Sequence, residues 1–254
     1  MPIDRGTLPV QLRRISARHF WAHEANHCAD LNPTANDRIQ PLMKIAVLGA
    51  WGNIGKRIVA EALHRGHAVT GIARNPAAAN PPVERFRVAA ADVTDAASLA
   101  EAIAGHDVVV GAVGPAHGTA PSLPADAARS LPAAARAAEV KRIVVIGGAG
   151  SLLVAPDLQL VDTPDFPPAW RPVALAHRDA LALWRAVSDL DWTYVSPAAM
   201  ITPGARTGNY QSGDDLLLVD AEGQSRISME DFAVAVLDLV EQGSHKRQRV
   251  TFAN

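Results

Sequence analysis

From residue 44 onward, short apolar runs alternate with segments that carry an apolar residue at every third or fourth position. The runs are typical of strands buried on both faces, and the second pattern is typical of amphipathic helices. Strands are predicted at residues 44–48, 67–73, 83–90, 107–113, 141–146, 191–195, 216–219 and 249–252. Helices are predicted at 54–63, 95–103, 125–138 (interrupted by proline), 173–187 and 229–240, with Ser228 as cap of the last. Such alternation predicts a parallel sheet with right-handed crossovers, a doubly wound α/β Rossmann domain.

The first 42 residues break this pattern. They mix arginines with prolines, asparagines and histidines, sustain no apolar period, and contain no 7–15-residue apolar core of a secretory signal. We therefore expect residues 1–42 to be a disordered extension ahead of a single domain at residues 43–254. Met43 stands directly before the first strand, which suggests the hypothesis that it is the natural start.

One motif in this extension matches a zinc-protease pattern. His23-Glu24-Ala25-Asn26-His27 places two histidines four residues apart with a glutamate between them. Zinc chemistry also needs a rigid helix and a third ligand. Asp30 follows at the next step, and Pro33 occupies the place where an extended motif would put its ligand. We therefore predict no metal site.

Composition narrows the classes of partner. The chain has 254 residues and a formal charge of −2 with no long basic run, so neither a nucleic acid nor an anionic membrane is indicated. No apolar run approaches the roughly 20 residues of a membrane-spanning helix. Cys28 is the only cysteine, which excludes an internal disulfide and makes the cytoplasm the default expectation. Nothing in the sequence indicates the oligomeric state.

The first strand runs into three glycines at a spacing of three residues, Gly49, Gly52 and Gly55, and then into a helix. Strand, glycine turn and helix in that order form a phosphate-binding device. Gly49 allows the sharp turn, Gly52 allows a diphosphate to approach the backbone, and Gly55 allows close packing of helix on strand. Within this loop, cofactor contacts are also expected from Trp51, Asn53 and Ile54.

The end of the second strand predicts which dinucleotide is bound. A carboxylate about 20 residues beyond the glycines accepts the ribose 2′-hydroxyl of NAD, whereas an arginine accommodates the 2′-phosphate of NADP. Arg74 stands nineteen residues after Gly55 with no acid nearby, which favours NADP(H), with NAD(H) possible. Asp92, followed by Val93, ends the third strand; it could accept a bond from the adenine amino group or simply begin a helix.

Further glycines follow the fourth and fifth strands. Val113 and Gly114 end the fourth, and Gly147 to Ser151, including Gly148, close the fifth. Glycine at a strand's carboxyl end is what close approach of a cofactor requires. Because parallel strands end at one edge, where such sheets bind ligands, this shared edge is the predicted site.

Several segments together carry a family resemblance: 44–55, 147–151, 162–167 (DTPDFP), 191–197 (DWTYVSP), 207–210 (TGNY) and 226–231 (RISMED). On these segments, which span nearly all of residues 43–254, the chain resembles atypical short-chain dehydrogenases/reductases of the NAD(P)H-binding branch, in particular NAD(P)H-flavin reductases and biliverdin/flavin reductases. The resemblance implies nicotinamide contacts at Pro197 and a catalytic serine at Ser151, although a turn hydroxyl bonded to its own backbone would look the same.

Standard members of that superfamily use a tyrosine and a lysine four residues later to deliver a proton. The only tyrosines here are Tyr194 and Tyr210, and alanine and aspartate stand four residues after them. His177, on an apolar helical stripe, is the candidate proton donor in their place, with a buried structural role as the alternative. Reduction of a flavin asks mainly for positioning, so we predict an NAD(P)H-dependent reductase with a flavin or similar flat molecule as substrate, not as bound prosthetic group. The alternatives are a non-catalytic redox sensor and, disfavoured by the absent tyrosine, an epimerase or isomerase.

Overall fold

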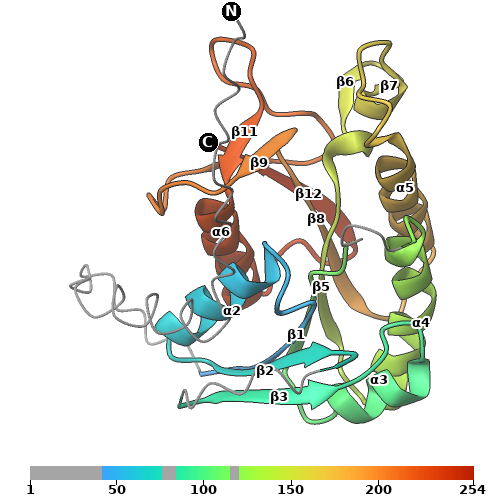
Figure 1. Cartoon of the computed structure of the whole chain (residues 1–254), viewed down its shortest axis with the longest axis vertical. Coiled ribbons are helices and arrows are strands. Elements are labelled where there is room, and N and C mark those ends of the chain that lie inside the picture. The colour runs from blue at the N-terminus through green and yellow to red at the C-terminus, as the bar shows by residue number, and fades with distance from the viewer. Residues whose placement is uncertain (1–41, 76–83, 115–119) are drawn as a thin grey trace, which may run out of the picture. The chain divides into compact units, whose positions relative to one another are not determined.

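The computed structural model describes residues 42–75, 84–114 and 120–254 (Figure 1). The chain divides into two compact units, residues 1–36 and 37–254, and every described residue belongs to the second. The predicted extension is therefore outside the described residues apart from Leu42, and so is the histidine motif at 23–27. The hypothesis of a natural start at Met43 stays a prediction.

An eight-stranded sheet in the order β10-β12-β8-β5-β4-β1-β2-β3 forms the centre of the domain. All neighbouring strands are parallel except β10, which runs antiparallel to β12. The strands of this sheet are β1 (Lys44–Leu48), β2 (Ala68–Ala73), β3 (Phe86–Ala90), β4 (Val108–Gly111), β5 (Arg142–Ile146), β8 (Asp191–Pro197), β10 (Gln211–Gly213) and β12 (Gln248–Ala253). This order confirms the predicted doubly wound α/β class.

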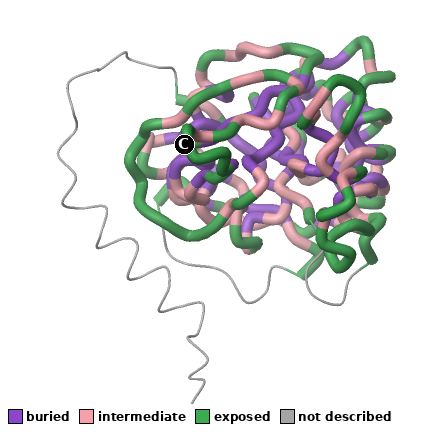
Figure 2. The backbone as a smooth tube through the Cα atoms, turned by 90° about the horizontal axis from the view of Figure 1, so that it is seen from above, coloured by how far each residue is buried: buried purple, intermediate pink, exposed green. Residues whose placement is uncertain are grey.

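Helices cover both faces of the sheet (Figure 1). On one face lie α2 and α6, and on the other lie α3, α4 and α5. Their bounds are α2 (Gly55–His64), α3 (Ala96–Ile103), α4 (Leu123–Ala137), α5 (Arg171–Arg185) and α6 (Met229–Gln242). As predicted, the Ser228 side chain caps α6 by accepting the Asp231 N–H. Buried residues gather in the interior of the domain (Figure 2). They make up nearly all of β1, β4 and β5, which explains the uninterrupted apolar runs.

The predicted helix at 125–138 is longer and unbroken. It forms α4, which continues through Pro132. A proline inside a helix removes one backbone hydrogen bond and usually bends or breaks it. Here Pro132 is buried among alanines and Leu131, so packing against the sheet holds the helix together.

The strand predicted at 216–219 is wrong. Only Leu216 forms an isolated bridge, with Leu153, while the edge strand is β10, a few residues earlier. The Asp215 carboxylate is bound by Arg249 from β12 and Arg185 from α5. The backbone of Asp215 and Leu217 bonds to Leu153 and does not continue the pairing of β10 with β12. The segment 152–169, predicted as a loop, contains a small hairpin, β6 (Leu153–Ala155) and β7 (Leu158–Gln159), and a 3₁₀ turn (Leu160–Asp162).

A second small sheet pairs β9 (Met200–Thr202) with β11 (Arg226–Ser228) in parallel. Between β9 and β10 lies the segment 203–210, which is fastened to α2 and α6 by carboxylates. Glu230 accepts the N–H of Gly204, Glu61 accepts two bonds from Arg206, and Asp231 accepts the N–H groups of Thr207 and Gly208. The irregular stretch is thereby held in one conformation without regular secondary structure.

Candidate functional site

A cleft of about 820 Å³ opens at the carboxyl ends of β1, β2, β4 and β5. In the sheet, β2 and β3 follow β1 on one side of it, whereas the next strand in the chain, β4, lies on the other side of β1. The cleft is therefore at the point where the strand order reverses. Ten of the predicted cofactor residues line it: Gly49, Trp51, Gly52, Asn53, Ile54, Arg74, Asp92, Val93, Val113 and Gly114. The structure therefore brings together residues that lie far apart in sequence, at the edge that the strand pattern predicts.

The glycine loop is packed so closely that two of its positions exclude a side chain. Gly49 has a φ of +73°, and a Cβ there would lie 2.4 Å from the carbonyl oxygen of Ala112 at the end of β4. A Cβ on Gly55 would lie 2.1 Å from the carbonyl oxygen of Gly49. These glycines thus serve the turn and the close packing of α2 on β1, as the sequence predicts.

Two other glycines border open space. Among the described residues, the carbonyl oxygen of Gly49 is the only atom beyond the chain neighbours within 4 Å of a Cβ added to Gly52, at 3.2 Å, and for Gly114 none lies that close. Both line the cleft. An added methyl group would enter the cleft, so their bare backbone leaves room for a ligand that touches the main chain.

The amino terminus of α2 supplies hydrogen-bond donors to this space. The first backbone bond of the helix is donated by Lys56 to the carbonyl oxygen of Gly52, so the N–H groups of Asn53, Ile54 and Gly55 precede it in the chain. Unpaired N–H groups and the partial positive charge of a helix amino terminus suit an anion. Together with the open space at Gly52, they fit the diphosphate of a dinucleotide.

Arg74 and Asp92 both line another part of the cleft. Arg74 is exposed at the end of β2, and among the described residues that line the cleft it is the only permanent cation. Asp92 accepts bonds from the N–H and the hydroxyl of Thr94 through one oxygen, Oδ1. These bonds, with the charge of Arg74, lower the pKa of Asp92, so it is a carboxylate at neutral pH. The cap of α3 is Asp95, so Asp92 does not begin that helix itself.

His177 lies on the opposite wall, on α5. Its ring contacts Gly148, where an added Cβ would lie 3.2 Å from a ring carbon. Burial lowers the pKa of His177 to about 4, so the imidazole is neutral at physiological pH. The prediction of His177 as a resident proton donor is therefore not supported by its environment, because an imidazolium would be needed to release a proton readily.

Tyr194 fixes the orientation of this histidine. Its hydroxyl donates to the carbonyl oxygen of His177 at 2.7 Å, and the hydroxyl oxygen lies 3.4 Å from His177 Nδ1. Because Tyr194 donates its hydroxyl hydrogen to the His177 carbonyl oxygen, the Tyr194 hydroxyl oxygen can act toward His177 Nδ1 only as an acceptor of an Nδ1–H bond. This pairing favours the tautomer with hydrogen on Nδ1 and leaves Nε2 as a hydrogen-bond acceptor. Burial raises the pKa of Tyr194, so it stays protonated.

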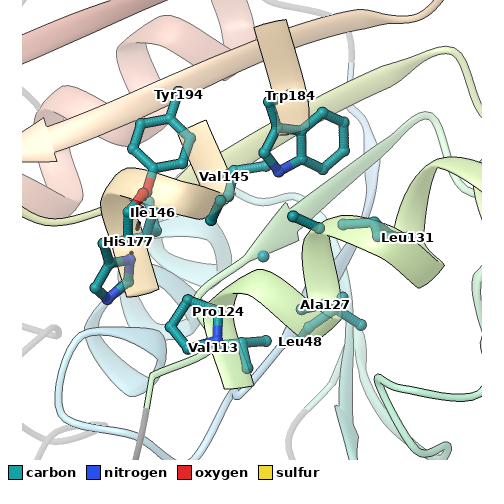
Figure 3. A pocket seen from close by; sticks show the side chains of 13 residues that line it. Leu48, Val113, Pro124, Ala127, Leu131, Val145, Ile146, His177, Trp184 and Tyr194 are labelled. Carbon is teal, nitrogen blue, oxygen red and sulfur yellow. Dashed lines mark hydrogen bonds between the residues drawn. The ribbon is translucent and has the colours of Figure 1, made fainter. Parts of the chain in front are cut away.

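Behind His177 lies a small apolar cavity of about 20 Å³, between α4, α5 and the sheet (Figure 3). Figure 3 shows Tyr194 and His177 pointing toward one another on one side of it, with Trp184 and Leu131 on the other. A space of this size admits about one water molecule, and its apolar lining offers such a molecule few partners. This cavity is therefore too small to hold a flat ring system.

Comparison with known proteins agrees with this geometry. A family model described as NAD(P)H-binding matches residues 49–242. The chain belongs to this NAD(P)H-binding family. In Bacillus subtilis the "uncharacterized protein YwnB" is 41% identical over 212 residues, which cover 82% of this chain and 97% of the relative.

Solved structures of family-like proteins superpose on most of the chain. A "putative NADH-flavin reductase" from Streptococcus pneumoniae is 34% identical with a TM-score of 0.73, covering 84% of this chain and 99% of the other. A "putative exported protein" from Burkholderia pseudomallei is 51% identical with a TM-score of 0.77, covering 84% and 100%. A "putative epimerase" from Bacteroides thetaiotaomicron is 34% identical with a TM-score of 0.78, covering 84% and 97%. The expected resemblance to atypical short-chain dehydrogenases/reductases is confirmed, and the fold of this family member is oxidoreductase-like.

Ser151 is not brought to the cleft. Its side chain is buried, and its Oγ accepts a bond of 2.9 Å from Nη1 of Arg249, which also bonds the Ser151 carbonyl oxygen. Arg249 is itself bound to Asp215, so the serine belongs to a buried link between β12 and the segment after β5. This placement favours a structural role over the predicted catalytic one.

Three predicted cofactor residues also lie outside the cleft lining. Gly55 lies beneath the loop, as described above, and Gly148 makes room for the ring of His177. Pro197 is buried at the end of β8, where it pairs with Phe252. Gly147 does line the cleft, but an added Cβ there would lie 2.0 Å from the ring of Tyr194, so the glycines after β5 accommodate side chains of the protein's own core.

Two features of the site were not predicted from the sequence. Leu123, which begins α4, lines the cleft, and Tyr194 orients His177. A leucine at a helix start carries no functional signal, and the contacts of Tyr194 with Gly147 and His177 join residues far apart in the chain, so no local pattern indicates them. Within the part of the chain that the structure describes, no helix is both long and apolar enough to cross a membrane, and no group of three or more histidine, cysteine or acidic residues is arranged to hold a metal ion.

Proposed function

We propose that this protein is an NAD(P)H-dependent reductase that uses NADPH in preference to NADH and reduces a flavin or a similarly flat, electron-poor acceptor. The observation that carries the proposal is a cleft that is lined by the glycine loop and Arg74 and receives no tyrosine hydroxyl as an acid. Tyr194 gives its proton to the His177 carbonyl, and Tyr210 gives its proton to Asp238 on another side of the domain. A neighbour named as an NADH-flavin reductase supports the same class of reaction.

Different residues of the cleft bind different parts of the dinucleotide. The N–H groups before α2 receive the diphosphate, and Arg74 receives the 2′-phosphate, for which a guanidinium is the better match because it is planar and donates two bonds at once. When bound, the reduced nicotinamide supplies the hydride. The chain's own part is then to hold the acceptor ring beside it and to keep water away.

His177 would contribute as a neutral acceptor of a hydrogen bond. With Nδ1 paired to Tyr194, Nε2 can accept a bond from an amide or ring N–H of a bound molecule. Such a bond orients the ring and needs no proton release. Reduction of a simple ketone, which requires a positioned acid, is not supported by these groups.

The test is steady-state oxidation of NADPH with riboflavin, FMN, FAD and quinones as acceptors, alongside direct measurement of NADPH and NADH binding by calorimetry. We expect turnover with at least one flat acceptor and tighter binding of NADPH. Tight binding without turnover would instead favour the sensor, a member of the fold that reports the cofactor's redox state to a partner. Absence of binding to either nucleotide at millimolar concentration would contradict both functions.

A further inference from the structure

The peptide bond between Asn53 and Ile54 is held by a side chain instead of by the helix. The backbone N–H of Arg57 bonds the carbonyl oxygen of Ile54 at 3.0 Å, one residue closer than the usual helical partner, Asn53. The carbonyl oxygen of Asn53 is bonded instead by Nη1 of the Arg57 side chain, at 2.8 Å. The orientation of this peptide plane therefore depends on Arg57.

The orientation matters because a peptide unit is planar and trans. Its C=O and the N–H of the next residue point in opposite directions. When the Asn53 carbonyl points to Arg57, the N–H of Ile54 must point away from Arg57. Asn53 and Ile54 line the cleft, and Arg57 is not among the described residues that do. Holding the carbonyl thus keeps the Ile54 N–H directed to the cleft side of the loop.

Arg57 is itself fixed from the opposite helix. Its Nε donates to Glu230 Oε1 at 2.6 Å in the first turn of α6, and Glu230 Oε2 accepts the N–H of Gly204 at 2.8 Å. The Arg57 and Glu230 side chains are only 16% and 26% exposed, so the pair is partly shielded from solvent. The loop at the cleft, α6 and the segment 203–210 are therefore joined through two side chains.

We propose that Arg57, braced by Glu230, is a positioning residue that keeps the Ile54 N–H presented to the diphosphate of the bound dinucleotide. This inference rests on the proposed function. It assigns to a pair of charged residues on two helices a role in cofactor affinity that neither the glycine spacing nor the cleft lining indicates. Loss of the pair allows the 53–54 peptide to turn over, which removes one donor from the anion site.

The experiment compares Arg57→Gln with wild type in two binding titrations, one with NADPH and one with 2′-AMP. The second ligand carries the phosphorylated ribose but no diphosphate. We expect the Kd for NADPH to rise about tenfold, because a bond to a charged group is lost, while the Kd for 2′-AMP changes less than twofold. Glu230→Gln, which keeps the volume but not the charge, should raise the NADPH Kd about threefold.

Arg65→Gln is the matched control. Arg65 also joins α2 to α6, through Asp238 and Glu241, but it lies at the far end of α2 from the loop. We expect this variant to melt at a lower temperature and to bind NADPH as wild type does.

If Arg57→Gln and Arg65→Gln lose NADPH affinity equally, or if Arg57→Gln weakens binding of NADPH and of 2′-AMP alike, Arg57 is merely structural and the inference is overturned. Unchanged affinity in both Arg57→Gln and Glu230→Gln overturns it too. Failure of wild type to bind any nicotinamide nucleotide would instead contradict the proposed function. If Arg57→Gln does not fold, Glu230→Gln decides alone.

Discussion

At the scale of single residues, the proposed preference for NADPH depends on Arg74. Replacing it by alanine removes the only permanent positive charge among the described residues that line the cleft. Because a charge-assisted hydrogen bond contributes about 1.5–3 kcal/mol, we expect the Kd of NADPH to rise about 10- to 100-fold. The Kd of NADH should change less than threefold, since NADH has no 2′-phosphate. Titration calorimetry with both nucleotides measures the two constants.

Arg85 provides a control for the loss of an exposed arginine near the same strands, because its Nη1 bonds the carbonyl oxygen of Gly66, away from the cleft. Arg85→Ala should leave the ratio of the two dissociation constants as in wild type. If Arg74→Ala keeps the wild-type preference for NADPH, the 2′-phosphate is held elsewhere and the role given to Arg74 is wrong.

His177 predicts a dependence of stability on pH. Its pKa falls from 6.5 to about 4 on folding, so between these values the unfolded chain binds a proton that the folded chain does not. The free energy of unfolding therefore decreases as the pH drops from 6.5 to 4, by at most about 3 kcal/mol from this group. Urea denaturation at pH 7 and pH 4.5 should show a smaller decrease for His177→Asn than for wild type. An equal decrease in both proteins would mean that the histidine is protonated in the folded state.

At the scale of elements, the strand-turn-helix unit separates two uses of glycine. Gly55→Ala would place a methyl group 2.1 Å from the Gly49 carbonyl and push α2 away from β1. We expect it to lower the free energy of unfolding by about 1–3 kcal/mol and to weaken NADPH binding. Gly114→Ala, with no described atom within 4 Å of the added carbon, should keep the wild-type melting temperature but still weaken binding, because its methyl group enters the cleft.

Thermal denaturation and NADPH titration of both variants check this difference. Gly105→Ala is unsuitable as a neutral control because Gly105 has a φ of +74°, so alanine would be strained there. Ala133→Gly is also unsuitable as a control, because it would change helix propensity and packing at the same time. Wild type therefore serves as the reference. Should Gly114→Ala bind NADPH normally, the open space beside it is not part of the cofactor site.

The same strand-turn-helix unit shows which parts of the fold and of the site can be predicted from the sequence. The glycine loop, the alternation of strands and helices and the cleft edge follow from local patterns, because apolar runs and glycine spacing reflect the backbone directly. The side-chain links could not be predicted in this way. Ser151 pairs with Arg249 and Tyr194 reaches over Gly147 to His177, through contacts between residues that lie far apart in the chain. Only the folded arrangement shows that these glycines make room for a tyrosine and a histidine.

At the scale of the whole molecule, the cleft joins strands from both halves of the sheet. It is lined from β1 and β2 on one side and from β4, β5 and α5 on the other. A ligand that contacts all of these elements binds the folded chain and not the unfolded one, so it stabilises the entire domain by mass action. Near His177, by contrast, the enclosed apolar space lined by the described residues measures only about 20 Å³, which is too small for the proposed flat acceptor.

This contrast predicts an order of stabilisation. NADPH or NADP⁺ at 100 times its Kd should add about 2.7 kcal/mol to the free energy of unfolding, which raises the melting temperature by about 5–10 °C in a domain of this size. FMN or riboflavin alone should raise it by less than about 2 °C, and the purified protein should show no flavin absorbance, because in the proposed reaction the flavin is a substrate that binds against the nicotinamide ring. Thermal melts with each ligand alone and with NADP⁺ plus flavin measure this order. A large shift with flavin alone would mean that the cleft binds flavin by itself, as a prosthetic group, and the assignment of hydride donor and acceptor would have to be revised.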